Sequence, residues 1–116
     1  MKVKSIVSNV AATNIDDAKQ FYGSIFGLTL VMDQRRIKTY SSGAKMTAQL
    51  SVASEGGSGT AVPDISIEVD DLDEVLKRVL AEKIQVDYGP VSEPWGVRRF
   101  CKSDPLGKLI NVLEHE

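Results

Sequence analysis

The sequence has few of the residues on which most enzyme sites depend. Among its 116 residues there is one histidine, His115, and one cysteine, Cys101. A single cysteine excludes an intrachain disulfide and fits a reducing compartment, so we expect a cytoplasmic protein. No apolar run approaches the length that crosses a bilayer. Near the N-terminus, Ser5, Ser8 and Asn9 interrupt the apolar segment that a secretion signal needs.

A strong charge of either sign is also missing. The formal net charge is −2, which argues against a nucleic acid or a membrane surface as a partner. The composition, 42% hydrophobic and 26% charged, is ordinary for a soluble globular protein. The length predicts one domain that can bury a core of its own.

The first half of the chain predicts one strand, one helix and three further strands. Residues 3–12 are rich in β-branched side chains and form the first strand. The helix begins after Asn14 as its N-cap and ends at Gly27. Its apolar face has helical spacing and consists of Ile15, Ala18, Phe21, Tyr22 and Ile25. The next three strands are expected at 28–32, 35–40 and 46–52, the last two joined by a turn at 41–43.

The same order of elements restarts after a connector rich in Gly and Ser at 54–60. A strand is expected at 64–69 and a helix whose N-cap is Asp71, with Glu74 three residues on. A strand at 84–88 and a hairpin of 97–102 with 109–113, turning at Asp104-Pro105-Leu106-Gly107, complete the repeat. A shift of 57 residues places Ile15 on Leu72. The domain therefore contains two modules, 1–56 and 61–116.

In each module the helix should cover one face of the sheet and leave the other face bare. We therefore predict an α+β fold in which two βαβββ modules form a curved eight-stranded mixed sheet, an open barrel with helices on the outer face. Alternation along the strands predicts the two faces. Ile65, Ile67, Val69, Ile110 and Val112 belong under the helix, whereas the cleft receives Asp64, Ser66, Glu68, Leu109, Asn111 and Leu113.

Two side chains near the second hairpin are typical of a ligand site. Trp95, held in a loop by Pro94 and Gly96, can stack on a planar ligand, or it can plug the core or a dimer interface. One arginine of the pair Arg98–Arg99 should face the cleft; we favour Arg99, whose guanidinium can pair with a carboxylate or phosphate, although a structural salt bridge explains it equally well. Other side chains expected to contact a ligand are Asp64, Asn111, Gln49 and Tyr88.

Candidates for catalysis are weaker. Asp64 and Glu68 share a strand face, and paired carboxylates can divide acid and base roles, but solvated or salt-bridged carboxylates are the simpler interpretation. Cys101 would need a neighbouring base to act as a nucleophile, so an inert thiol is favoured. His115, the penultimate residue, is expected to fray and to take no part.

The order and spacing of these motifs resemble the vicinal oxygen chelate superfamily, which groups glyoxalase I, bleomycin-resistance proteins and extradiol dioxygenases. The resemblance covers essentially the whole chain and is closest to bleomycin-resistance-type members. It implies paired βαβββ modules around a ligand site and frequently a homodimer. The motifs are Phe21-Tyr22-Gly23 with Gly27-Leu28, the segment 67–73, and Trp95-Gly96 with Arg99, Phe100, Asp104-Pro105 and Gly107.

Metal-dependent members of that superfamily place His and Glu ligands in the first and last strands of each module. Transferred to this sequence, the positions are Val7, Asp64, Asn111 and either Gln49 or Ser51. Val7 cannot bind a cation, and amide or hydroxyl oxygens are weak ligands for first-row metals. We therefore expect no metal and no other cofactor.

The sequence thus predicts a metal-free protein that sequesters a planar or acidic organic molecule in the sheet cleft. Trp95 would stack on this ligand and Arg99 would pair with its acidic group. The alternative is a glyoxalase- or dioxygenase-like enzyme, a lyase or isomerase, with a divergent metal site. A carboxylate-driven isomerase that uses Asp64 or Glu68 belongs to the same alternative.

Overall fold

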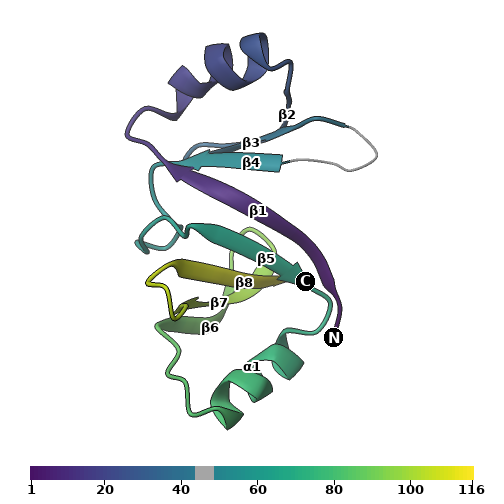
Figure 1. Cartoon of the computed structure of the whole chain (residues 1–116), viewed down its shortest axis with the longest axis vertical. Coiled ribbons are helices and arrows are strands. Elements are labelled where there is room, and N and C mark those ends of the chain that lie inside the picture. The colour runs from purple at the N-terminus through teal and green to yellow at the C-terminus, as the bar shows by residue number, and fades with distance from the viewer. Residues whose placement is uncertain (44–48) are drawn as a thin grey trace. The chain divides into compact units, whose positions relative to one another are not determined.

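The computed structural model describes residues 1–43 and 49–116 (Figure 1). Its strands form one mixed, unclosed sheet in the order β2-β3-β4-β1-β5-β8-β7-β6. With the helical segments, this confirms the predicted α+β fold of two βαβββ modules. The strands are β1 (Val3–Ala11), β2 (Thr29–Gln34), β3 (Ile37–Ser41), β4 (Gln49–Ala53), β5 (Ile65–Val69), β6 (Tyr88–Glu93), β7 (Val97–Ser103) and β8 (Leu109–His115).

The chain divides into two compact units. The first, called here the N-terminal unit, is Val7–Val62; the second, the C-terminal unit, is Met1–Ile6 with Pro63–Glu116. Between them, residues 54–64 contain neither helix nor strand, as predicted for the connector at 54–60. No helix among the described residues is long and apolar enough to cross a bilayer.

In the N-terminal unit the sheet is built from β1, β4, β3 and β2. β1 pairs with β4 in parallel from Ser8 to Ala11, and β4–β3 and β3–β2 are antiparallel. The core of this unit consists of Ile15, Ala18, Tyr40 and Val52, with Tyr22 and Leu28 packed against it. The part of the predicted fourth strand at 46–48 lies outside the described residues.

The helix predicted from Asn14 to Gly27 is wound differently from the prediction. It consists of a 3₁₀ turn, η1 (Ile15–Asp17), and a π-helical segment, η2 (Lys19–Ile25). Asn14 precedes the turn, but its side chain donates to the Asp17 carboxylate instead of capping the backbone. The wider π winding breaks the 3.6-residue period of the apolar face. Phe21 and Ile25, predicted to be buried, are consequently 51% and 64% exposed.

The third strand begins later than predicted because Arg35 and Arg36 form the two-residue turn between β2 and β3. These residues were expected to begin the strand at 35–40. Arg36 instead donates to the carbonyl oxygen of Glu55, 3.4 Å away. Gly27 has a φ of +68°, the left-handed conformation expected of a residue that ends a helix.

The C-terminal unit contains the one α-helix among the described residues, α1 (Leu72–Ala81). As predicted, Asp71 caps it: an oxygen of its carboxylate accepts from the backbone N–H of Glu74 at 3.1 Å. The helix packs on one face of the sheet, where Leu72 is fully buried. Its neighbours are the apolar side chains predicted for that face, Ile67, Val69, Ile110 and Val112, together with Phe100.

One predicted strand of the C-terminal unit is wrong. Residues 84–87 contain no strand, and β6 runs instead from Tyr88 through Gly89-Pro90 to Glu93. The predicted strand ended at Tyr88, just before Gly89-Pro90. Proline cannot donate to a ladder, but edge strands tolerate it, and β6 is an edge strand. The β7–β8 hairpin and its turn are confirmed, with the N–H of Gly107 bonded to the carbonyl oxygen of Asp104.

Replacing Asp71 with alanine removes the acceptor for the N–H of Glu74. We expect the free energy of unfolding, measured by urea denaturation, to fall by about 1 kcal/mol. Asp71→Asn keeps an oxygen in the same place and serves as the matched control, with a smaller loss. An alanine variant as stable as the wild type would show that the cap adds no stability.

Candidate functional site

The centre of the C-terminal unit is a buried ion pair. Arg99, on β7, is 2% exposed and Glu93, at the end of β6, is 7% exposed. The Nε of Arg99 donates to a carboxylate oxygen of Glu93 at 2.8 Å. Taking two charges out of water costs several kcal/mol each, so such a pair requires close geometry and further hydrogen bonds. The neighbouring side chains provide them.

Two aromatic rings lie against the guanidinium of Arg99. Its Cζ is 5.0 Å from the centroid of the Tyr88 ring and 5.4 Å from that of the Trp95 ring. Both distances are within the range of cation–π attraction, which strengthens when the cation is desolvated. The Tyr88 hydroxyl also lies 3.2 Å from both carboxylate oxygens of Glu93, to which it donates. Arg99 and Glu93 therefore fix the positions of both rings.

A chain of polar contacts continues from Arg99 across the sheet. Its Nη1 donates to the amide oxygen of Asn111, on β8, at 3.4 Å, and the amide nitrogen of Asn111 donates to the Ser66 hydroxyl, on β5, at 3.2 Å. The register explains this alignment, because Asn111 is the partner of both Ser66 and Cys101. The face predicted to be polar therefore carries a connected network across three strands.

Cys101 belongs to this network as a buried thiol. It is 1% exposed and lies 3.7 Å from the amide oxygen of Asn111. Burial raises the pKa of the Cys101 thiol, and the nearby Glu93 adds to this, while the Arg99 cation opposes it. A thiol whose ionisation is suppressed is a poor nucleophile, which supports the inert role that the sequence favoured.

Local backbone geometry places Tyr88 and Trp95 beside Arg99. Gly89 has a φ of +81°, and a Cβ there would lie 2.5 Å from the carbonyl oxygen of Arg99, so only glycine lets β6 approach β7 this closely. The hairpin then turns through residues 94–96, and the N–H of Gly96 bonds to the carbonyl oxygen of Glu93. Trp95 occupies this turn, half-buried against the sheet, as the loop prediction requires.

Glu93 is the residue of this network that sequence reasoning missed as a functional candidate. Its position six residues before Arg99 carries no motif. A prediction with the correct bounds of β6 would have identified Glu93 as the partner of Arg99. In the register of β6 with β7, Glu93 pairs with Val97 across the turn, and only this register brings Glu93 next to Arg99. The error in the strand thus concealed the partner of the arginine. Arg98, on the opposite face, pairs with Asp73 of α1.

His115 is not a frayed terminal residue, contrary to prediction. It is the last residue of β8 and pairs with Val97 of β7. Its Nδ1 lies 2.8 Å from a carboxylate oxygen of Glu68, and the Ser5 hydroxyl donates to the other oxygen of Glu68 at 3.4 Å. The sequence could not show this contact, because it joins residues 47 positions apart.

The remaining predicted residues are not part of this network. Asp64 precedes β5, and its carboxylate accepts from the N–H of Leu109 at 2.8 Å, which ties the start of β5 to β8. Gln49 is an exposed residue of β4 in the other unit. Of the six predicted ligand contacts, four are brought together: Tyr88, Trp95, Arg99 and Asn111.

The residues at the positions of the superfamily's metal ligands do not fit a metal ion. The Asp64 carboxylate holds a backbone N–H, the Asn111 amide is bonded to Arg99 and Ser66, and the Ser51 hydroxyl is bonded to Thr39 at 2.8 Å. Val7 offers no donor atom. Within the described ranges, no three His, Cys, Asp or Glu side chains gather closely enough to hold a metal.

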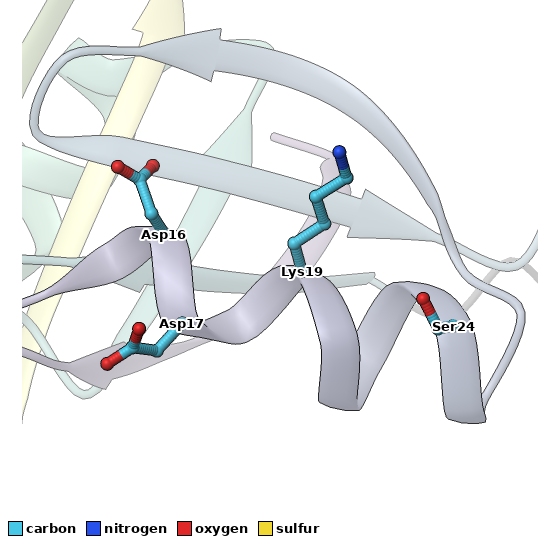
Figure 2. A pocket seen from close by; sticks show the side chains of 4 residues that line it. All are labelled: Asp16, Asp17, Lys19 and Ser24. Carbon is cyan, nitrogen blue, oxygen red and sulfur yellow. The ribbon is translucent and has the colours of Figure 1, made fainter.

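A hollow elsewhere in the molecule is a poorer candidate. It lies in the N-terminal unit and is lined by Asp16, Asp17, Lys19 and Ser24 (Figure 2). All four side chains come from η1 and η2, and no aromatic side chain lines it. Asp16 is 76% exposed and already paired with Lys38 at 2.7 Å. We therefore regard it as a solvated surface depression.

Comparison with known proteins identifies a family. Residues 3–112 match the model of the Glyoxalase/Bleomycin resistance protein/Dioxygenase superfamily. No curated protein matches the sequence.

Solved structures with the same fold include three of particular interest. An NAD-dependent benzaldehyde dehydrogenase from Legionella pneumophila has a TM-score of 0.76 at 12% identity, covering 97% of this chain and all of that one. A glyoxalase/bleomycin resistance protein/dioxygenase superfamily member from Vibrio splendidus 12B01 has a TM-score of 0.67 at 14% identity, and the match covers 99% of this chain and 100% of that one. Methylmalonyl-CoA epimerase from Mycobacterium tuberculosis has a TM-score of 0.62 at 18% identity, and the match covers 98% of this chain and 87% of that one. At such identities the likeness establishes the fold alone.

Breaking the buried pair should destabilise the protein strongly. Arg99→Met leaves the Glu93 carboxylate buried without its cation, and we expect a loss of about 3–5 kcal/mol in urea denaturation. The double variant Arg99→Met with Glu93→Leu leaves no buried charge, so much of that loss should be recovered. If the losses of the two single variants simply add in the double variant, the two side chains are not coupled.

Proposed function

Since the chain belongs to the glyoxalase/bleomycin resistance protein/dioxygenase superfamily, we propose that it binds a small planar organic molecule on the Trp95 face of the C-terminal unit, without a metal ion. This is the sequestering role of the bleomycin-resistance type. The location proposed is the cytoplasm, where a free thiol such as that of Cys101 stays reduced.

The observation that carries the proposal is the arrangement of Trp95, Tyr88 and Arg99. An indole whose position is fixed before binding loses little conformational freedom when a ligand stacks on it. Trp95 is half-buried, so part of its surface remains accessible while Arg99 lies against its ring. Stacking of flat rings on an indole needs no charge on the ligand.

Arg99 takes a different role from direct pairing with an acidic group. Its charge is already compensated by Glu93, and only 2% of its surface is exposed. Contact with a ligand carboxylate would require breaking that pair in a buried environment, at a cost of several kcal/mol. Arg99 is therefore a positioning residue that acts through Trp95 and Tyr88, and recognition does not require a negative charge on the planar ligand.

An isomerase or lyase is the second candidate function, and one observation favours it. Glu68 is held by Ser5 and His115, so a carboxylate and an imidazole lie together on the sheet. Such a pair can accept a proton from a substrate. Among the structurally similar proteins is an enzyme of this general kind, methylmalonyl-CoA epimerase, which makes epimerisation of an acyl-CoA the reaction to assay first.

Trp95→Ala should abolish the binding of planar aromatic compounds and leave the fold intact. We expect wild-type Trp95 fluorescence to change saturably on titration with such compounds, with aromatic acids and their neutral amides binding comparably. Calorimetry then measures affinity in the variant, which lacks the fluorophore. Leu106→Ala, at an 83% exposed turn position of the same unit, is the matched control. Undiminished binding by Trp95→Ala, or loss of its circular dichroism spectrum, would contradict the proposal.

We also propose that the protein is a homodimer, paired through the N-terminal unit. Six large apolar side chains of η2, Phe26 and β2 are between 37% and 64% exposed, namely Phe21, Ile25, Phe26, Leu30, Val31 and Met32. Their exposed areas sum to an apolar surface on the order of 500 Å², distributed over η2 and over both faces of the edge strand β2, where Leu30 pairs with Tyr40 and Met32 with Thr39. No described strand pairs with the outer edge of β2. A second copy of the chain would cover these apolar side chains and the outer edge of β2.

Val31→Asp should convert the dimer to a monomer, because it places a charge among these apolar side chains. Sedimentation velocity measures the change. Ile84→Asp introduces the same charge at a 39% exposed position of the C-terminal unit and should leave the dimer unchanged. A wild-type protein that sediments as a monomer at all concentrations would refute the dimer.

A further inference from the structure

The lone histidine of the chain is held in one orientation by a carboxylate. An ionised carboxylate can only accept hydrogen bonds, so at 2.8 Å from Glu68 the Nδ1 of His115 carries the hydrogen and donates it. In the neutral imidazole the other nitrogen, Nε2, is then an acceptor. Nε2 makes no hydrogen bond to any residue that the structure describes. The His115 side chain is 62% exposed, so this acceptor is open to a ligand.

Glu68 is itself held in place, which distinguishes this pair from a chance surface contact. Its side chain is 22% exposed, and its second oxygen accepts from the Ser5 hydroxyl of β1. Three strands, β1, β5 and β8, thus contribute one residue each. An orienting carboxylate, then the ring, then an open nitrogen is the order of contacts that fixes the tautomer and the orientation of an imidazole in other proteins.

His115 lies beside the proposed stacking site. It pairs with Val97, two residues after Trp95, and the N–H of Glu116 bonds to the carbonyl oxygen of Gly96 at 2.9 Å. Val97 and Arg99 are alternate residues of β7, so their side chains share a face, and it is against Arg99 that the Trp95 ring lies. Leu113, partner of Arg99 and two residues before His115, is also on this face.

We infer that this face selects planar ligands that bear an acidic hydroxyl group, such as phenols or enols. The hydroxyl donates to the Nε2 of His115, and Glu68 stabilises the positive charge that the ring acquires as the proton moves toward it. The inference rests on the proposed binding function and specifies its ligand class. No bond other than the O–H bond changes, and the proton returns when the ligand leaves.

A pair of probes that differ in one hydrogen-bond donor tests the inference. para-Cyanophenol carries the hydroxyl and keeps most of it un-ionised at neutral pH, whereas para-methoxybenzonitrile is an equally planar methyl ether without it. Calorimetric titration of the wild type should show binding of the phenol about tenfold or more tighter than that of the ether. In His115→Phe, which keeps a flat ring but has no acceptor, both probes should bind with the weaker affinity. Glu68→Gln should reduce the preference part of the way.

Nitrogen NMR of the wild type provides a readout that needs no variant. Because His115 is the only histidine, one pair of ring nitrogen signals is expected, and in the free protein they should report the tautomer protonated at Nδ1. The phenol, but not the ether, should shift the Nε2 signal toward that of an imidazolium. Equal affinities in the wild type, an unchanged preference in His115→Phe, or no response of Nε2 would each overturn the inference.

The outcomes separate this inference from the function on which it rests. If both probes bind equally and Trp95→Ala abolishes both, the stacking site stands and the hydroxyl selection by His115 is refuted. If neither probe binds, the proposed binding function falls and takes this inference with it.

Discussion

The pairing of Arg99 with Glu93 is the interaction on which the C-terminal unit depends. A guanidinium that is 2% exposed has lost its water, and its neighbours together compensate for that loss. Glu93 provides the charge, Tyr88 and Trp95 provide ring faces, and Asn111 provides an amide oxygen. The same contacts that satisfy the cation fix the aromatic side chains that could receive a ligand. In this unit stability and preorganisation therefore have one physical origin.

The two faces of the sheet in this unit have different tasks. One face is apolar and packs under α1, with Leu72 and Phe100 at its centre. The other carries the polar network and the pair of His115 with Glu68. Strict alternation along β5, β7 and β8 separates the two sets of side chains. The fold is that of the superfamily, but at its metal-ligand positions this chain has an apolar residue or side chains bonded to protein groups. Recognition through rings and hydrogen bonds is the chemistry that these residues offer.

The sequence predicted the fold well because the fold depends on local patterns. Alternation along β5, the cap at Asp71 and the turn at Asp104 each act within a few residues. All three are confirmed, since Ile67 and Val69 pack in the core while Ser66 and Glu68 make polar contacts on the other face. The site was harder to predict from the sequence, because its contacts depend on the register in which β6, β7 and β8 pair. The strand predicted at 84–88 ended at Tyr88, where β6 begins its run to Glu93, so Glu93 had no strand partner in the prediction, although Arg99 was placed on the polar face of its strand. The contact between Glu68 and His115 joins the neighbouring strands β5 and β8, which are far apart in the sequence, so it has no local signature.

The prediction of an α-helix in the N-terminal unit was wrong for a different reason. Its apolar residues have α-helical spacing, yet tertiary packing selects a 3₁₀ turn and a π segment, which bury Ile15 and Ala18 and expose Phe21 and Ile25. Intrinsic propensity is a weak constraint that packing overrides. Phe21 and Ile25, exposed by this winding, belong to the apolar surface proposed for the dimer. The difference from the predicted α-helix therefore has a functional interpretation.

Amide NMR during titration with a set of small planar aromatic compounds would test the central claim most directly. The claim is that ligands bind on the face of the C-terminal unit organised by Arg99. The account predicts that the signals that shift cluster at the Trp95 indole N–H and on β7 and β8 around Arg99 and Leu113. Shifts confined to the hollow lined by Asp16 and Lys19, or no shifts at any concentration, would contradict it.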